Sequence, residues 1–143
     1  MKKIFFILGI FLYVFATDVH SQQKQLLYFC ETYDEANGRE VGVSDIFEIP
    51  PTGGYLTVMV NLAPIGTVIG TTDVDLKIYK VENGELRYIS TEPFNVETDW
   101  DYIFFSEITF YEEGIYKVEL DKGDGTYVCS GYVEIVFPDS NAY

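Results

Sequence analysis

The fold of this chain is decided by the stretch Phe110-Tyr111-Glu112-Glu113-Gly114-Ile115-Tyr116-Lys117-Val118. Within it one strand ends, Gly114 permits a turn because it lacks a Cβ, and Tyr116 opens the next strand with its side chain pointing inward. Alternation with period two recurs on both sides of this stretch, whereas helical periodicity is nowhere sustained. The sequence therefore predicts an all-β fold.

Further strands are expected wherever apolar alternation runs between clusters of Gly, Pro, Asn and Asp. The best hairpin signal is Asn83-Gly84, because both residues tolerate the positive φ of a type I′ turn. Apolar rows on every strand need a second sheet to cover them, which predicts an antiparallel β-sandwich of about seven to eight strands. The expected strands are Leu26–Cys30, Val41–Ile49, Tyr55–Leu62, Val74–Tyr79, Glu85–Ser90, Tyr102–Phe110, Tyr116–Leu120 and Tyr127–Phe137.

The N-terminal segment has the pattern of a secretory signal. Two lysines precede an apolar run at 4–16, which is too short to span a bilayer. Val19 and Ser21 give the small-x-small pattern that signal peptidase needs. We therefore predict a signal peptide at 1–21 and one mature domain at 22–143, secreted or periplasmic and without a membrane span.

Cleavage after Ser21 also removes His20, the single histidine of the chain. The mature protein would then lack every catalytic or metal site that needs an imidazole, including Ser-His-Asp triads and His-ligated zinc. Cleavage after Ala16 and an uncleaved N-terminal anchor are the alternatives.

The 143-residue chain is strongly acidic. It has 9 Lys plus Arg against 23 Asp plus Glu, a formal net charge of −14 at pH 7. Such a field repels phosphate backbones and anionic lipid, which argues against nucleic acid and acidic membrane as partners.

The two cysteines, Cys30 and Cys129, lie near opposite ends of the mature chain. Period-two alternation places Cys30 inward together with Tyr28 in the first strand, and Cys129 inward in the last strand. In the strand at Tyr102–Phe110, the same alternation places Phe104 and Ile108 on one inward face. In an oxidising compartment we predict a disulfide between the two cysteines, with two buried thiols as the alternative.

The pattern Phe-x-x-x-Gly-x-Tyr-x-Val at Phe110 to Val118 resembles the corner between late strands of immunoglobulin-like sandwiches, where a Tyr hydroxyl binds upstream backbone. Bacterial extracytoplasmic immunoglobulin-like modules are similar to this chain. The resemblance implies a module that binds, spaces or supports other proteins. The antibody-type Cys two residues after the corner Tyr is absent, because Val118 stands there, and no Trp lies in the early central strand. The other segments that share the resemblance are Phe29-Cys30-Glu31, Phe47-Glu48-Ile49 and Gly131-Tyr132-Val133-Glu134-Ile135.

Three pairs of aspartates fall at or near expected strand ends, where loops could gather carboxylates around Ca²⁺. Solvated acidic turns are the alternative, because the stretch Asp121 to Thr126 lacks the ligand spacing of a calcium loop. We predict no metal site and keep Ca²⁺ as the alternative. The pairs are Asp73 with Asp75, Asp99 with Asp101, and Asp121 with Asp124.

Trp100, Tyr102 and Tyr111 would suit a platform for a sugar ring, or a plug at the sandwich end. Two acidic pairs, Glu112 with Glu113 and Glu97 with Asp99, have the residue types of glycosidase carboxylates, but nothing in the sequence indicates the cleft that such a pair needs. We therefore predict no catalytic residues.

The sequence as a whole predicts a non-enzymatic binding or interaction module of the cell envelope, without a cofactor. Its expected partner is another envelope or secreted protein, bound at strand edges or end loops. The alternatives are a carbohydrate-binding module, assisted by calcium, and a secretion or attachment domain.

Overall fold

The computed structural model describes residues 25–139, and the chain over that range is all-β, as predicted. The expected signal peptide at 1–21 lies outside the described residues. Over the described range no helix is long and apolar enough to cross a membrane. The elements are β1 (Leu27–Cys30), β2 (Thr32–Asp34), β3 (Arg39–Val41), β4 (Ile46–Glu48), β5 (Gly54–Asn61), the 3-10 helix η1 (Ala63–Ile65), β6 (Asp73–Glu82), β7 (Glu85–Asn95), β8 (Tyr102–Phe110), β9 (Gly114–Lys122) and β10 (Tyr127–Val136).

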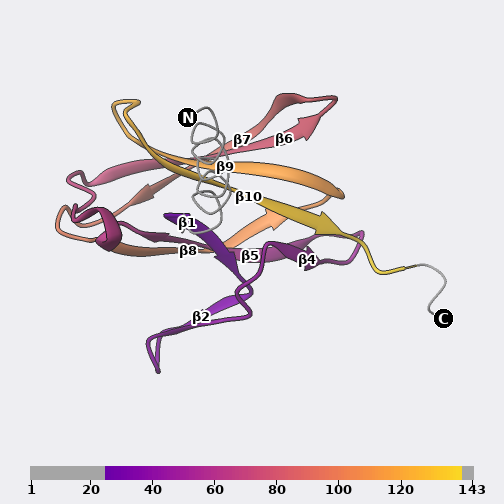
Figure 1. Cartoon of the computed structure of the whole chain (residues 1–143), viewed down its shortest axis with the longest axis horizontal. Helices are drawn as coiled ribbons and strands as arrows, with labels where there is room; N and C mark the ends of the chain where they lie inside the picture. The colour runs from indigo at the N-terminus through magenta and orange to yellow at the C-terminus, as the bar shows by residue number, and fades with distance from the viewer. Residues whose placement is uncertain (1–24, 140–143) are drawn as a thin grey trace, which may run out of the picture.

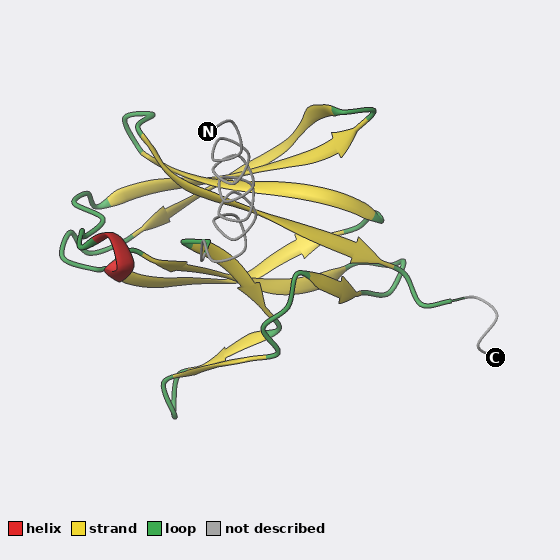
Figure 2. Ribbon diagram, in the orientation of Figure 1, coloured by secondary structure: helices red, strands yellow, loops and turns green. Residues whose placement is uncertain are grey.

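The strands form two layers (Figures 1 and 2). One sheet has three strands in the order β1-β5-β8, and the other has five in the order β4-β10-β9-β6-β7. The strands β1 and β4, which come early in the described range, belong to different sheets. β1 pairs antiparallel with β5, and β4 pairs parallel with β10. At this crossing from one sheet to the other, the chain makes an extra hairpin, β2–β3, which lies outside the two layers, on the side of the three-stranded sheet (Figure 1).

A single hydrophobic core fills the space between the sheets and receives side chains from both. Two aromatic pairs join the layers directly: Phe94 and Phe105 have ring centroids 4.8 Å apart, and Phe110 and Tyr116 meet edge-on at 4.9 Å. Aromatic contacts of this kind add about 0.5–1.5 kcal/mol beyond the burial of their area.

Two local predictions are confirmed. Asn83 and Gly84 have φ values of 52° and 77° and join β6 to β7 as a two-residue turn. At the corner, the Tyr116 hydroxyl donates a 2.8 Å hydrogen bond to the carbonyl oxygen of Glu112, which is the backbone contact that the resemblance implied.

The inward face of β8 differs from the prediction. Ile103 and Phe105 are buried in the core at one end of β8, as are Ile108 and Phe110 at the other, whereas Phe104 lies on the outer face. The strand pairing with β5 is irregular between these halves, and Glu107 there has a φ of 60°. An extra residue in a strand reverses the faces of all the residues beyond it, so simple alternation assigned Phe104 wrongly.

The predicted disulfide is absent from the structure. Cys30 and Cys129 are both free thiols, and both are buried. Leu27 and Phe29 fill the inward positions of β1, so Cys30 points to the outer face of the three-stranded sheet. Cys129 belongs to the core between the sheets. The two thiols therefore lie on opposite faces of one sheet, which excludes the geometry of a disulfide.

Candidate functional site

The outer face of the five-stranded sheet carries three tyrosines and one lysine in a row across four strands. Tyr88 of β7 pairs with Tyr79 of the neighbouring strand β6. Lys117 of β9 lies between Tyr79 and Tyr132 of β10 and pairs with both. We call these four residues the tyrosine row. Tyr79 and Tyr88 meet edge-on, with ring centroids 6.0 Å apart.

The tyrosine row lies open to solvent. Tyr88 is 57% exposed and Tyr132 48% exposed, although both are large aromatic side chains. Exposed apolar residues flank the row on the same face, and such a patch on a folded domain commonly marks a place of contact with another molecule. The flanking residues are Ile46, Leu86, Ile115 and Tyr127.

Charges of both signs surround the tyrosine row. Lys77 forms a 2.8 Å ion pair with the buried Asp121, and Lys117 lies 3.7 Å from Glu119. Burial and the nearby charge of Asp121 raise the pKa of Glu119. The second carboxylate oxygen of Asp121 has no hydrogen-bond partner among the described residues. The face is therefore mixed in charge, in contrast to the acidic chain as a whole.

The outer face of the three-stranded sheet is covered instead by the β2–β3 hairpin. Tyr33 of the hairpin stacks on Phe104 of β8, with ring centroids 4.5 Å apart. Met59 is fully buried on this face between Phe104 and Tyr28, its neighbours on the adjacent strands. The sandwich thus has a second, smaller apolar cluster outside its main core.

A carboxylate from the hairpin joins the two tyrosines at the edge of this cluster. The hydroxyls of Tyr28 and Tyr102 both donate hydrogen bonds to the same oxygen of Glu40. Burial, followed by the bond to Glu40, raises the pKa of Tyr102 to about 12 and that of Tyr28 still further. The network holds Glu40 in place at the hydroxyl of Tyr28.

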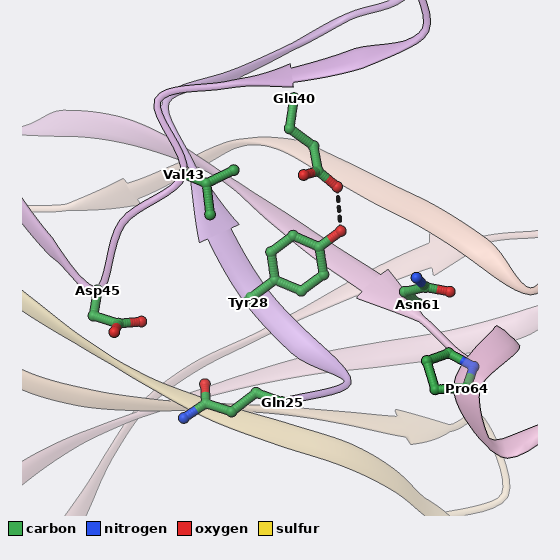
Figure 3. A pocket seen from close by; sticks show the side chains of 7 residues that line it. All are labelled: Gln25, Tyr28, Glu40, Val43, Asp45, Asn61 and Pro64. Atoms are coloured by element: carbon green, nitrogen blue, oxygen red, sulfur yellow. Dashed lines mark hydrogen bonds between the residues drawn. The ribbon is translucent and has the colours of Figure 1, made fainter. Parts of the chain in front are cut away.

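A hollow of about 520 Å³ opens beside this network (Figure 3). One aromatic ring, that of Tyr28, stands in the middle of the close-up, with polar side chains around it (Figure 3). The volume lies within the range of small-molecule sites. The residues that line the hollow are Gln25, Tyr28, Glu40, Val43, Asp45, Asn61 and Pro64.

The aspartates weighed as calcium ligands do not converge. Between residues 25 and 139 no group of three or more His, Cys, Asp or Glu side chains is placed to hold a metal ion. Asp121 is paired with Lys77, and Asp124 instead accepts the backbone N–H of Thr126 at 2.9 Å.

The three aromatic residues weighed as a sugar platform or an end plug are separated. Tyr102 and Tyr111 lie at opposite ends of β8, which at the usual rise per residue puts them roughly 25–30 Å apart. Tyr111 instead packs against Gly53. Of the three, only Tyr102 reaches the Glu40 network, and Trp100 does not line the hollow.

The acidic pair at the corner has structural partners. Glu112 accepts hydrogen bonds from Lys80 at 2.9 Å and from Arg87 at 3.4 Å, and Glu113 accepts the N–H of Phe137 at 2.7 Å. The hydrogen bond from Lys80, together with the charge of that side chain, holds the pKa of Glu112 below its usual value.

Sequence reasoning missed the tyrosine row and the Glu40 network. The row had a usable signal in the sequence. Period-two alternation with Val74, Leu76 and Ile78 puts Tyr79 on the polar face beside Lys77, and a tyrosine at a solvent-facing position invites a functional explanation. No signal in the sequence indicated Glu40, because its role depends on how the hairpin folds back.

Comparison with known proteins found neither a family model that matches the chain nor a curated protein similar to it.

Proposed function

We propose that this protein is a secreted or periplasmic immunoglobulin-like module, without enzymatic activity, that binds another envelope or secreted protein through the outer face of its five-stranded sheet. The single observation that carries the proposal is the open tyrosine row. Tyrosine supplies a large, rigid contact area with a polar tip, and it is enriched in protein interfaces for that reason.

Two further observations support the immunoglobulin-like assignment. The Tyr116 hydroxyl binds the backbone at the corner, and the first part of the chain is shared between the two sheets. The N-terminal signal pattern supports export, and an exported interaction module needs neither a histidine nor a cofactor.

Crosslinking of the tagged protein in its native cell envelope tests the proposal. The wild type is compared with a variant that carries Tyr88→Ser and Tyr132→Ser, and with a matched control that carries Tyr55→Ser and Tyr111→Ser. The two control tyrosines are 66% and 65% exposed and lie away from the row. We expect one dominant protein partner for the wild type and the control, and its loss from the row variant.

Capture of the same proteins by all three chains would contradict the proposal. So would enrichment of polysaccharide without protein, or hydrolytic or redox turnover by the purified mature chain.

A further inference from the structure

We propose that the hollow beside the Glu40 network is a binding site for a neutral sugar residue. The site lies on the outer side of the three-stranded sheet, whereas the tyrosine row lies on the outer face of the other sheet. It therefore adds a second ligand to the protein-binding role and does not depend on it.

The ring of Tyr28 supplies the surface on which a sugar would stack. The C–H groups of one face of a pyranose pack well against an aromatic ring. Tyr28 is held in position because its hydroxyl donates to Glu40, which also accepts from Tyr102. A fixed ring and a fixed acceptor reduce the entropy that a ligand loses on binding.

Two hydrogen-bond acceptors belong to the lining of the hollow. Glu40 and Asp45 both contribute carboxylates, and no ion pair joins either of them to a basic side chain within residues 25–139. Two carboxylates without a counter-charge repel anionic sugars such as uronic acids. They accept hydrogen bonds from neutral hydroxyls.

Donors complete the lining. Asn61 uses its carbonyl oxygen to accept the backbone N–H of Ala63 at 3.1 Å, which leaves the amide NH₂ to point elsewhere. Figure 3 shows that nitrogen on the side of Asn61 that faces Tyr28, and Gln25 brings a second amide to the hollow. A simple cation would need acceptors only, whereas vicinal hydroxyls use donors and acceptors together, so the mixed lining favours a sugar over an amine.

NMR titration of the purified, isotope-labelled mature chain tests this site. The probes are oligosaccharides that end in glucose, galactose, mannose or N-acetylglucosamine, one that ends in glucuronic acid, and methylammonium as a simple cation. We expect at least one neutral probe to shift the backbone amides of Gln25, Tyr28, Val43 and Asn61, and neither charged probe to do so.

Two variants localise the binding. Asp45 pairs with no basic side chain among the described residues, so Asp45→Asn should fold normally. The amide keeps one acceptor oxygen but loses the charge that strengthens the hydrogen bond, so the affinity for the neutral probe should fall by about fivefold. The matched control Asp99→Asn lies in the loop before β8 and should bind like the wild type.

Three outcomes would overturn the site: no neutral probe shifts these amides, methylammonium binds there more tightly than every sugar, or Asp45→Asn and Asp99→Asn bind equally. The proposed protein-binding role would survive any of them, because it is tested with the tyrosine row.

Discussion

The outer faces of the two sheets both carry aromatic side chains, yet one face is covered and the other is open. On the three-stranded sheet the β2–β3 hairpin stacks Tyr33 on Phe104 and buries Met59 completely. On the five-stranded sheet Tyr88 and Tyr132 stand in solvent. Aromatic content therefore does not distinguish a structural face from a binding face, because the presence of a covering element decides which it is.

Charge separates the two sheets as well. Strands β1, β5 and β8 contain no Lys or Arg, whereas the five-stranded sheet carries five basic residues. The strands of the covered sheet hold a single charged residue, Glu107, whereas the open sheet carries charges of both signs. The five residues are Lys77, Lys80, Arg87, Lys117 and Lys122.

The largest expected effect is at the centre of the covered face. Met59→Ala should lower the free energy of unfolding by about 2–5 kcal/mol, as in a main core, because it leaves a cavity under the hairpin. Chemical denaturation followed by circular dichroism measures this. A loss below roughly 1 kcal/mol would show that the hairpin does not bury this face in solution.

Removal of the cover itself should have a smaller, local effect. Tyr33→Ala removes a stacking contact worth about 1 kcal/mol, so the hairpin should open about fivefold more often. Cys30 lies beside the hairpin, with its thiol 3.3 Å from the carbonyl oxygen of Thr32, and burial raises its pKa to about 11.

The reactivity of the thiols reports this opening. With a disulfide-exchange reagent, Cys30 should react faster in Tyr33→Ala than in the wild type, and Cys129 should stay protected, because burial in the main core raises its pKa to about 12. Acceleration at Cys129 alone would contradict the placement of the two thiols. A count of two free thiols in the protein, denatured without a reducing agent, would confirm that no disulfide joins Cys30 and Cys129.

The Glu40 network should appear in an alkaline titration. The folded-state pKa of Tyr102 is about 12 against an ordinary value of 10.0, so its contribution to stability is fully present below pH 10.0 and is lost as the pH rises to about 12. Glu40→Gln removes the charge that the phenols face and should lower that pKa, which ultraviolet absorbance of tyrosinate measures. The matched change Glu134→Gln, on the other sheet, should leave it unaltered.

The smallest effect is expected on the open face. Tyr132→Ser should change the free energy of unfolding by no more than about 0.5 kcal/mol, because the side chain is half exposed and covers no core residue. The same denaturation experiment measures it. A loss comparable to that of Met59→Ala would mean that the tyrosine row has a structural role and would remove the main argument for a binding face.

Regular strands and tight turns were predictable from local residues. The bounds expected for β8 agree with those observed, and Asn83-Gly84 forms the expected turn, because alternation and positive φ are local properties. The bulge at Glu107 was not predictable, since it depends on the pairing of β8 with β5. It is the reason that Phe104 faces outward.

The candidate sites were harder to predict than the strands. The stretch 32–40 is mostly polar and contains the turn signal Asn37-Gly38, yet Tyr33 covers a sheet face and Glu40 organises the hollow. The row from Tyr88 to Tyr132 depends on the register of four strands that are far apart in the sequence.

By itself, the sequence determined the all-β class, the positions of most strands, the corner at Tyr116 and the acidic charge, because these depend on side-chain chemistry and short-range periodicity. The tertiary structure alone decided which face each side chain occupies, that Cys30 and Cys129 stay apart, and which aromatic face is covered. Those outcomes depend on one-residue shifts of register and on one hairpin that folds back, and long-range packing sets both.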